Sequence, residues 1–171
     1  MKNEAIDVLM TRRSVRSYKS EQVTEEELKI VLDAGTFAPT ARGIQPAFIV
    51  AVQSEDERKI VSELNAKVAN LSGDPYHGAP TILLVLAPNT NLGILDGAAV
   101  ITNMANAAHA IGLSSCWINR PQQMFETPEG KALLKKWELD ETLCGVASLS
   151  LGYSDAAPIA APRKEGYYRI V

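Results

Sequence analysis

The chain has 171 residues, a length that suits one domain over 1–171, and its 46% hydrophobic and 22% charged residues are typical of a globular protein. Its net charge of −3 argues against a general nucleic-acid surface, because counterion release rewards a wide basic face. No basic and apolar leader opens the sequence, and the longest apolar run, 81–87, is too short to cross a bilayer, so we expect a cytoplasmic protein with no membrane partner.

Apolar periodicity and capping signals predict helices that alternate with strands. The clearest start signal is the capping box of Thr24 and Glu27, which begins a helix that Pro39 ends. Two helices have a clear apolar side, formed by Ile6, Leu9 and Met10 in the first and by Ile60, Leu64 and Val68 in the third. In chain order we predict a helix over 3–11, a helix over 25–38, a strand over 48–53, a helix from Ser54 through Val68, a strand over 81–87, a helix over 94–112, a strand over 113–118, a helix from Thr127 through Trp137, a strand over 145–153 and a last strand over 167–171.

The predicted helix 94–112 is dense in alanine and glycine and ends at Gly112. Small side chains let neighbouring backbones approach closely, which indicates a central helix with neighbours on several sides. Composition alone leaves open whether those neighbours belong to the same chain or to a second copy. Together with the order of elements, the pattern predicts an α+β or α/β fold in which helices cover a sheet.

Several common catalytic patterns are absent from the sequence. It has no G-x-G-x-x-G after a strand, no phosphate-binding P-loop, no H-E-x-x-H and no G-x-S-x-G. His77, His109 and two separate cysteines offer little to a zinc site, so we expect no metal. We interpret His109 as a hydrogen-bonded core or interface residue, and Cys116 and Cys144 as reduced packing thiols. We nominate no catalytic side chain and expect a cofactor to carry any reaction.

The stretch "TRRSVRSYKS" at 11–20 concentrates positive charge in an acidic protein. Four cations fall within eight positions: Arg12, Arg13, Arg16 and Lys19. A compact set of arginine and serine donors suits a phosphomonoester, because the guanidinium fork and the hydroxyl share its oxygen lone pairs. The alternative is a solvated surface, or pairing with the acids of the second helix.

Four motifs in order extend this hypothesis: "RRSVRSY", "APTARGIQPA", "LDGAAVITNMANAAHAIGLSSCWI" and "SLGYSDAAPIAAPRK". Over essentially the whole chain this series resembles the nitroreductase family of FMN-dependent oxidoreductases, in its short form. The resemblance implies an α+β sandwich whose central, mostly antiparallel sheet is flanked by helices. It also implies an intertwined homodimer with two FMN molecules at the interface.

The resemblance assigns the basic residues to parts of FMN. Arg12 and Ser14 match positions that bind the phosphate, and Arg13 between them would meet phosphate or ribityl. Arg16 matches the cation at the pyrimidine edge of the flavin. The C-terminal "PR" motif adds two residues that return to the phosphate, Arg163 and, as a helper, Lys164.

Other matches surround the flavin ring. Residues Pro39, Thr40 and Ala41 match a loop that comes from the other subunit. Further matches to the ring site are Gly43, Gln45, Ile118 and Asn119, with a backbone amide near the last two facing flavin N5. The chain departs from the family pattern at six positions, because serine is common at Thr40 and Ala41, asparagine at Gly43, an aromatic residue at Ala47, glycine at Asn119 and a basic residue at Ala161.

The resemblance implies an FMN-dependent NAD(P)H oxidoreductase with NADH or NADPH as the donor. Hydride would pass through flavin N5 in a ping-pong reaction to a small-molecule acceptor, such as a nitroaromatic or a quinone. One alternative is a reductive dehalogenase or flavin-fragmenting relative, which would need a lid, and the candidate lid over 72–80 is short. Another is a flavin-binding or anion-sensing module without turnover.

Overall fold

A four-stranded antiparallel sheet in the order β1-β2-β4-β3 forms the centre of the computed structural model, which describes residues 3–171. The strands are β1 (Phe48–Val52), β2 (Thr81–Pro88), β3 (Ser114–Ile118) and β4 (Leu143–Gly152). The helices are α1 (Glu4–Thr11), α2 (Glu25–Thr36), α3 (Glu55–Ala69), α4 (Asn91–Ala110), α5 (Pro121–Glu126) and α6 (Pro128–Lys136), with a short 3-10 turn η1 (Ala41–Gly43). No helix within the described range combines the length and apolar character needed to cross a membrane.

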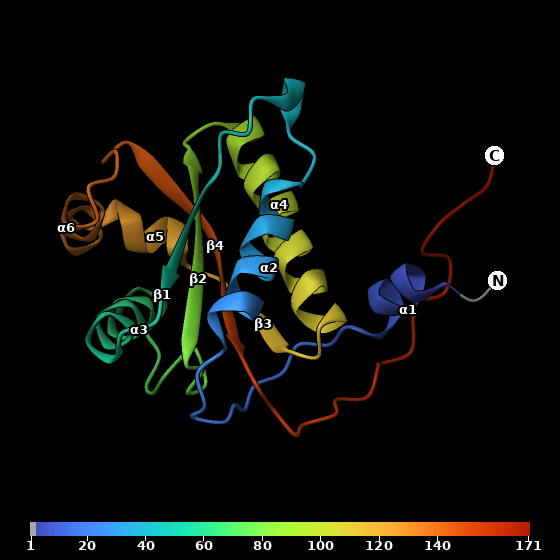
Figure 1. Ribbon diagram of the computed structural model, residues 1–171. Helices are drawn as coiled ribbons and strands as arrows, with labels where there is room; N and C mark the ends of the chain where they lie inside the picture. The colour runs from blue at the N-terminus through green and yellow to red at the C-terminus, as the bar shows by residue number, and fades with distance from the viewer. Residues whose placement is uncertain (1–2) are drawn as a thin grey trace.

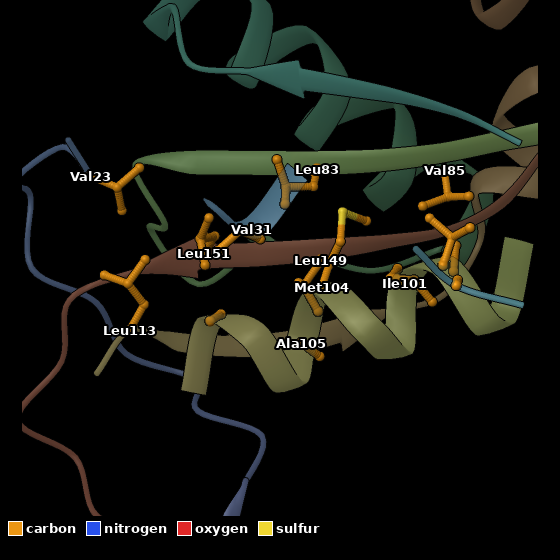
Figure 2. Close-up of a cluster of buried hydrophobic side chains, with 14 residues drawn as sticks. Val23, Val31, Leu83, Val85, Ile101, Met104, Ala105, Leu113, Leu149 and Leu151 are labelled. Atoms are coloured by element: carbon orange, nitrogen blue, oxygen red, sulfur yellow. The ribbon is translucent and has the colours of Figure 1, made fainter. Parts of the chain in front are cut away.

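Helices cover both faces of the sheet, with α2 and α4 on one side and α3, α5 and α6 on the other (Figure 1). Successive strand residues point to opposite faces, so Leu83 and Val85 face α4 while Ile82 and Leu84 face the other helices. Figure 2 shows the α4 side, where Met104 lies among strand side chains. The predicted α+β architecture is confirmed.

Capping signals located the helix starts well. Thr24 Oγ1 accepts the Glu27 amide at 3.2 Å, and Glu27 Oε2 accepts the Thr24 amide at 2.9 Å, which completes the predicted box. Ser54 and Thr127 also cap their helices as predicted. The prediction that Ile60 faces the core was wrong: Ile60 is exposed, and the neighbouring Val61 is buried. Leu64 is buried and Val68 packs partly buried against the core, as predicted.

Two further predictions require correction, and one helix was not predicted. Helix α4 begins at Asn91, capped by Thr90, three residues before the predicted start at 94. The six-residue α5 was not predicted, because so short a segment carries no readable period. The predicted strand 167–171 is absent: residues 153–171 contain no helix or strand, and the tail leads away from the sheet (Figure 1). Within residues 3–171 the tail pairs with no strand of the sheet, so it does not form one.

Candidate functional site

The basic segment runs beside β3 at the edge of the sheet. Ser14 forms a parallel bridge with Ser115, and the Val15 amide donates to the Ser115 carbonyl at 3.0 Å. Farther along, the Lys19 amide donates to the Tyr153 carbonyl at 2.9 Å. These backbone bonds fix the segment at both ends, so its side chains project from a defined position.

Tyr18 fastens the middle of this segment, a role that sequence reasoning missed. Its hydroxyl donates to the Val15 carbonyl at 2.7 Å and lies 2.8 Å from Ser150 Oγ on β4. Burial raises the pKa of the Tyr18 phenol, so it stays protonated as a donor. The neighbouring Arg16 is exposed, and its guanidinium has no hydrogen bond or ion pair within residues 3–171.

A cavity of about 380 Å³ opens where the basic segment meets the end of α4. Its polar and charged lining consists of Thr11, Arg12, Arg13, His109, Ser114, Ser115 and Ser154. No carboxylate is among the lining residues. The donor set therefore suits a phosphate group, whose oxygens accept from guanidinium, imidazole and hydroxyl groups.

His109 is hydrogen-bonded, as predicted. Its Nε2 lies 2.9 Å from Thr11 Oγ1, and the Thr11 hydroxyl itself donates to the Asp7 carbonyl at 2.5 Å. The single hydroxyl proton is thereby used, so Nε2 is the donor to Thr11 and carries a proton. Partial burial, and then the charges of Arg12 and Arg13, lower the pKa of His109. An anion in the cavity would offset the effect of the two arginines.

The loop at 39–45 has an unusual backbone. Arg42, Gly43 and Gln45 have φ values of 58°, 66° and 53°, in the left-handed region. Thr40 Oγ1 accepts the Gln45 amide at 3.1 Å, so the threonine that replaces a serine keeps a hydroxyl contact with the loop backbone. Thr40, Gln45 and Ala47 share the lining of a 140 Å³ cavity between α2 and β1.

Buried polar groups hold the backbone at the end of β3. Ser148 Oγ donates to the Ile118 carbonyl at 3.0 Å, and Asn65 Nδ2 donates to the Asn119 carbonyl at 2.9 Å. Asn65 also donates to the hydroxyl of buried Tyr76 at 3.2 Å, and Tyr76 in turn lies 3.0 Å from Ser148 Oγ. The backbone that the resemblance places at flavin N5 therefore rests on a connected network, whose members sequence reasoning did not identify.

The structure does not bring all predicted site residues together within one chain. Arg163 and Lys164 lie in the exposed tail, and the Arg163 guanidinium donates to the Ala161 carbonyl at 3.1 and 2.6 Å. Arg12 and Arg13 line the cavity beside β3, whereas Ser14, Arg163 and Lys164 are not among its lining residues.

The loop and the basic segment lie at opposite ends of α4. Asp96 near the start of α4 contacts the loop at Ala41, and His109 near its end lines the basic cavity. Positions 96 and 109 are 13 residues apart, which is about 20 Å along the axis at about 1.5 Å per residue. In Figure 1 the turn at the top lies beyond the start of α4, and α1 at the right lies near its end. Within one chain, the length of α4 therefore separates the loop from the basic segment.

Comparisons with known proteins agree on one family. The Nitroreductase family profile matches residues 9–81. A provisionally named NADH dehydrogenase/NAD(P)H nitroreductase of Archaeoglobus fulgidus is 27% identical over 159 residues, which cover 88% of this chain and 85% of that protein. The chain covers 60 or 61% of three longer relatives from Methanothermobacter thermautotrophicus and Bacillus subtilis.

Solved structures share the fold over the full length. A nitroreductase of Bacteroides fragilis, crystallised with bound FMN, has a TM-score of 0.89 and 27% identity, covering 99% of this chain and 100% of its own. A nitroreductase of Desulfitobacterium hafniense has a TM-score of 0.90 at 19% identity, with both chains covered completely, and this likeness concerns the fold alone.

Proposed function

We propose that the chain is a member of the nitroreductase family and acts as an FMN-dependent NAD(P)H oxidoreductase. The observation that carries the proposal is the cavity beside β3, which joins Arg12, Arg13 and His109 to three serines without a carboxylate. Such a donor set fits the terminal phosphate of FMN. The bound FMN of the Bacteroides fragilis relative supports the same choice of cofactor.

The cationic end of the proposed site also favours FMN over FAD. In FMN the phosphate is terminal and can be enclosed from several sides. In FAD an adenylate continues from that phosphate and would have to leave through the arginine and serine groups. We therefore expect the chain to bind FMN more tightly than FAD, and reconstitution that gives the opposite order would contradict the proposed phosphate site.

In this proposal the protein binds and orients the reactants. When bound, FMN supplies a ring that takes hydride from NADH or NADPH and passes it to an oxidised acceptor. Arg12 and Arg13 line the cavity and hold the phosphate, and Ser14, Arg163 and Lys164, which lie outside that lining, complete the proposed contacts. Arg16 lies at the pyrimidine edge, and the backbone at Ile118–Asn119 faces the reactive side of the ring. No side chain is assigned as an acid or a base, so position and electrostatics are the contribution of the chain.

We further propose that a homodimer completes the site. Pro39, Thr40, Ala41, Gly43 and Gln45 would reach the flavin of the partner, since about 20 Å separates this loop from the basic segment of its own chain. The apolar side of α1 supports a partner, because Ile6, Leu9 and Met10 are 50%, 58% and 69% exposed. In a dimer, a second copy would cover such residues.

Conjugated electrophiles such as nitroaromatics and quinones are the proposed acceptors. The reductive dehalogenase and flavin-fragmenting alternatives need a lid, and the structure of segment 72–80 does not favour one. The Asp74 carboxylate accepts the amides of Tyr76 and Gly78 at 2.8 and 2.6 Å and the Ser62 hydroxyl at 2.6 Å, and Tyr76 is buried. The segment is thus a fixed turn packed against α3.

The test is the visible spectrum of the purified chain after addition of FMN. We expect a yellow complex that NADH or NADPH bleaches and a quinone recolours. Arg12→Gln should weaken FMN binding, and the matched control Lys59→Gln, an exposed cation on α3, should not. A chain that takes up no FMN would refute the cofactor. A complex that neither nucleotide bleaches would leave a flavin-binding module without turnover.

A further inference from the structure

Asp96 is the one acidic side chain that is buried within residues 3–171, with 7% of its surface exposed. A buried carboxylate is costly unless hydrogen bonds compensate for the lost water. Asp96 Oδ1 accepts the backbone amide of Ala41 at 2.9 Å, from a residue 55 positions earlier in the chain. The described hydrogen bond of the Asp96 carboxylate is thus made to the loop at 39–45. The N-terminus of α4 is capped by Thr90 and not by Asp96.

The loop needs an external hold. Arg42 and Gln45 are not glycines, yet both have left-handed φ values, which persist where the surroundings determine them. Bonds inside the loop link Gln45 and Gly43 to Thr40, and Ile44 to Ala41. Among the described hydrogen bonds of residues 39–46, the bond from Ala41 to Asp96 is the one that reaches the rest of the fold.

We propose that Asp96 is a positioning residue, whose carboxylate holds the Pro39–Gln45 loop in the shape that meets the flavin of the partner subunit. The first half of this inference concerns this chain alone, and the second half rests on the proposed function. A carboxylate makes a stronger bond to an amide than a neutral acceptor does. The loop is then ordered before the cofactor arrives, so that binding does not have to order it.

Limited proteolysis without FMN tests the first half. Arg42 is exposed at the centre of the loop, so trypsin cleavage after Arg42 reports how often the loop leaves its folded shape. We expect Asp96→Ala to be cut there at least tenfold faster than the wild type. Asp96→Asn keeps an acceptor oxygen and should restore most of the protection. Thr102→Ala is the matched control, because its exposed hydroxyl on the same helix bonds to the Ala98 carbonyl of that helix. Equal cleavage of Asp96→Ala and the wild type would overturn the proposal.

If Asp96→Ala does not fold, hydrogen exchange of the wild-type chain tests the same bond. The Ala41 amide should exchange at least tenfold more slowly than in an unstructured peptide, because it donates to a buried carboxylate. Exchange at the rate of an unstructured peptide would refute the hold on the loop.

FMN titration tests the second half. We expect Asp96→Ala to bind FMN at least tenfold more weakly than the wild type, with Asp96→Asn between the two. The absorption bands of the bound flavin should also shift in Asp96→Ala, because the loop lies along the ring. Faster cleavage with unchanged FMN affinity and spectrum would mean that the loop does not meet the flavin. A wild type that binds no FMN would refute the proposed function. The cleavage rates would still show whether Asp96 holds the loop in its folded shape.

Discussion

The cations of the basic segment lie in different surroundings. The Arg13 guanidinium donates to the carbonyls of Met10 and Arg12 at 2.9 and 2.6 Å, so part of its donor capacity shapes the local backbone. Lys19 pairs with Asp155 at 2.7 Å, at the start of the tail. The Arg16 guanidinium has no such partner within the described chain. Of the three, Arg16 has the most donor capacity left for a ligand.

Arg16 should tune the flavin, and Arg163 should hold it. In the proposed site Arg16 lies at the pyrimidine edge, where two-electron reduction at neutral pH leaves negative charge, so the guanidinium favours the reduced state. Arg16→Gln should therefore lower the midpoint potential, by about 30 mV for each 1.4 kcal/mol lost. Arg163 would meet a phosphate whose charge is constant, so Arg163→Gln should weaken FMN binding about tenfold at a nearly unchanged potential. Potentiometry and FMN titration separate the two effects. An unchanged potential in Arg16→Gln would remove Arg16 from the pyrimidine edge.

His109 should make the unfolding free energy depend on pH in the window from its ordinary pKa of about 6.5 down through its lowered pKa in the folded chain. Because burial and the two arginines lower its pKa in the folded chain, the folded state favours the neutral imidazole. That contribution is complete above the unfolded pKa of about 6.5 and is lost as the pH falls through the folded pKa. Denaturant unfolding should therefore show a loss of stability in this window, and His109→Gln should lose less. Asp74 and Glu27 have lowered pKa values and titrate at more acidic pH, outside the window. An identical loss in His109→Gln would contradict the assignment.

Helix α4 is the element on which the fold and the site both depend. Its buried side packs against α2 and the sheet, and its two ends contact the loop and the basic cavity. The small residues permit this close packing: a Cβ added at Gly97 would lie 2.7 Å from Val146 Cγ2 on β4. The buried side of α4 thus has its neighbours within the chain, while Leu92 and Leu95 remain exposed.

Gly97→Ala should destabilise the chain although alanine favours a helix. The better helix propensity is worth about 1 kcal/mol, and the contact with a stiff valine costs about 1–3 kcal/mol. The double variant Gly97→Ala with Val146→Ala should recover much of that cost, because the second change makes room for the first. Denaturant unfolding of the two single variants and the double variant measures the coupling. Additive effects would show that the close approach does not limit stability.

Local signals explain which elements the sequence could predict. The capping box at Thr24 and the caps at Ser54 and Thr127 involve residues three or four positions apart, so they can be recognised in the sequence without knowledge of the fold. The strand predicted over 167–171 has the right residue types, but a strand also needs a neighbour, and that requirement cannot be read from five residues. Ile60 shows the same limit, since the position of the apolar side on α3 is decided by what packs against it.

Long-range partners explain what the sequence could not show of the site. The arginine and serine residues of the basic segment were identifiable by their own chemistry. Asp96 and Asn65 were not, because each acts through a backbone group more than fifty positions away. The sequence also does not reveal the hydrogen bond between the hydroxyls of Tyr18 and Ser150, which lies on a strand far along the chain. Side chains that contact a ligand are therefore easier to predict than those that position the backbone.

At the scale of the whole molecule, the tail has more apolar surface than a single chain can cover. Ile159, Tyr167, Tyr168 and Ile170 are between 83% and 94% exposed, and residues 153–171 form no helix or strand. The edge strand β1 pairs with β2 on one side, and Phe48 on it is 47% exposed. Exposed apolar residues in a long segment mark an interaction site more often than a free end. We expect the tail to pack on the partner subunit of the proposed dimer.

Deletion of 167–171 should weaken the dimer and, with it, FMN binding. The deleted residues include Tyr167, Tyr168 and Ile170, whose apolar surface would be buried between subunits, whereas Arg163 is retained. Because each site is proposed to need a loop from the partner, separation of the subunits should lower FMN affinity although no phosphate contact is removed.

Sedimentation of the deleted and full-length chains over a range of concentrations measures this loss, and FMN titration follows it. Arg163→Gln is the matched control: it should sediment as the dimer and lose FMN affinity alone. A deleted chain that stays dimeric at the lowest concentration would show that the tail does not join the subunits. A monomer with full FMN occupancy would refute the shared site itself.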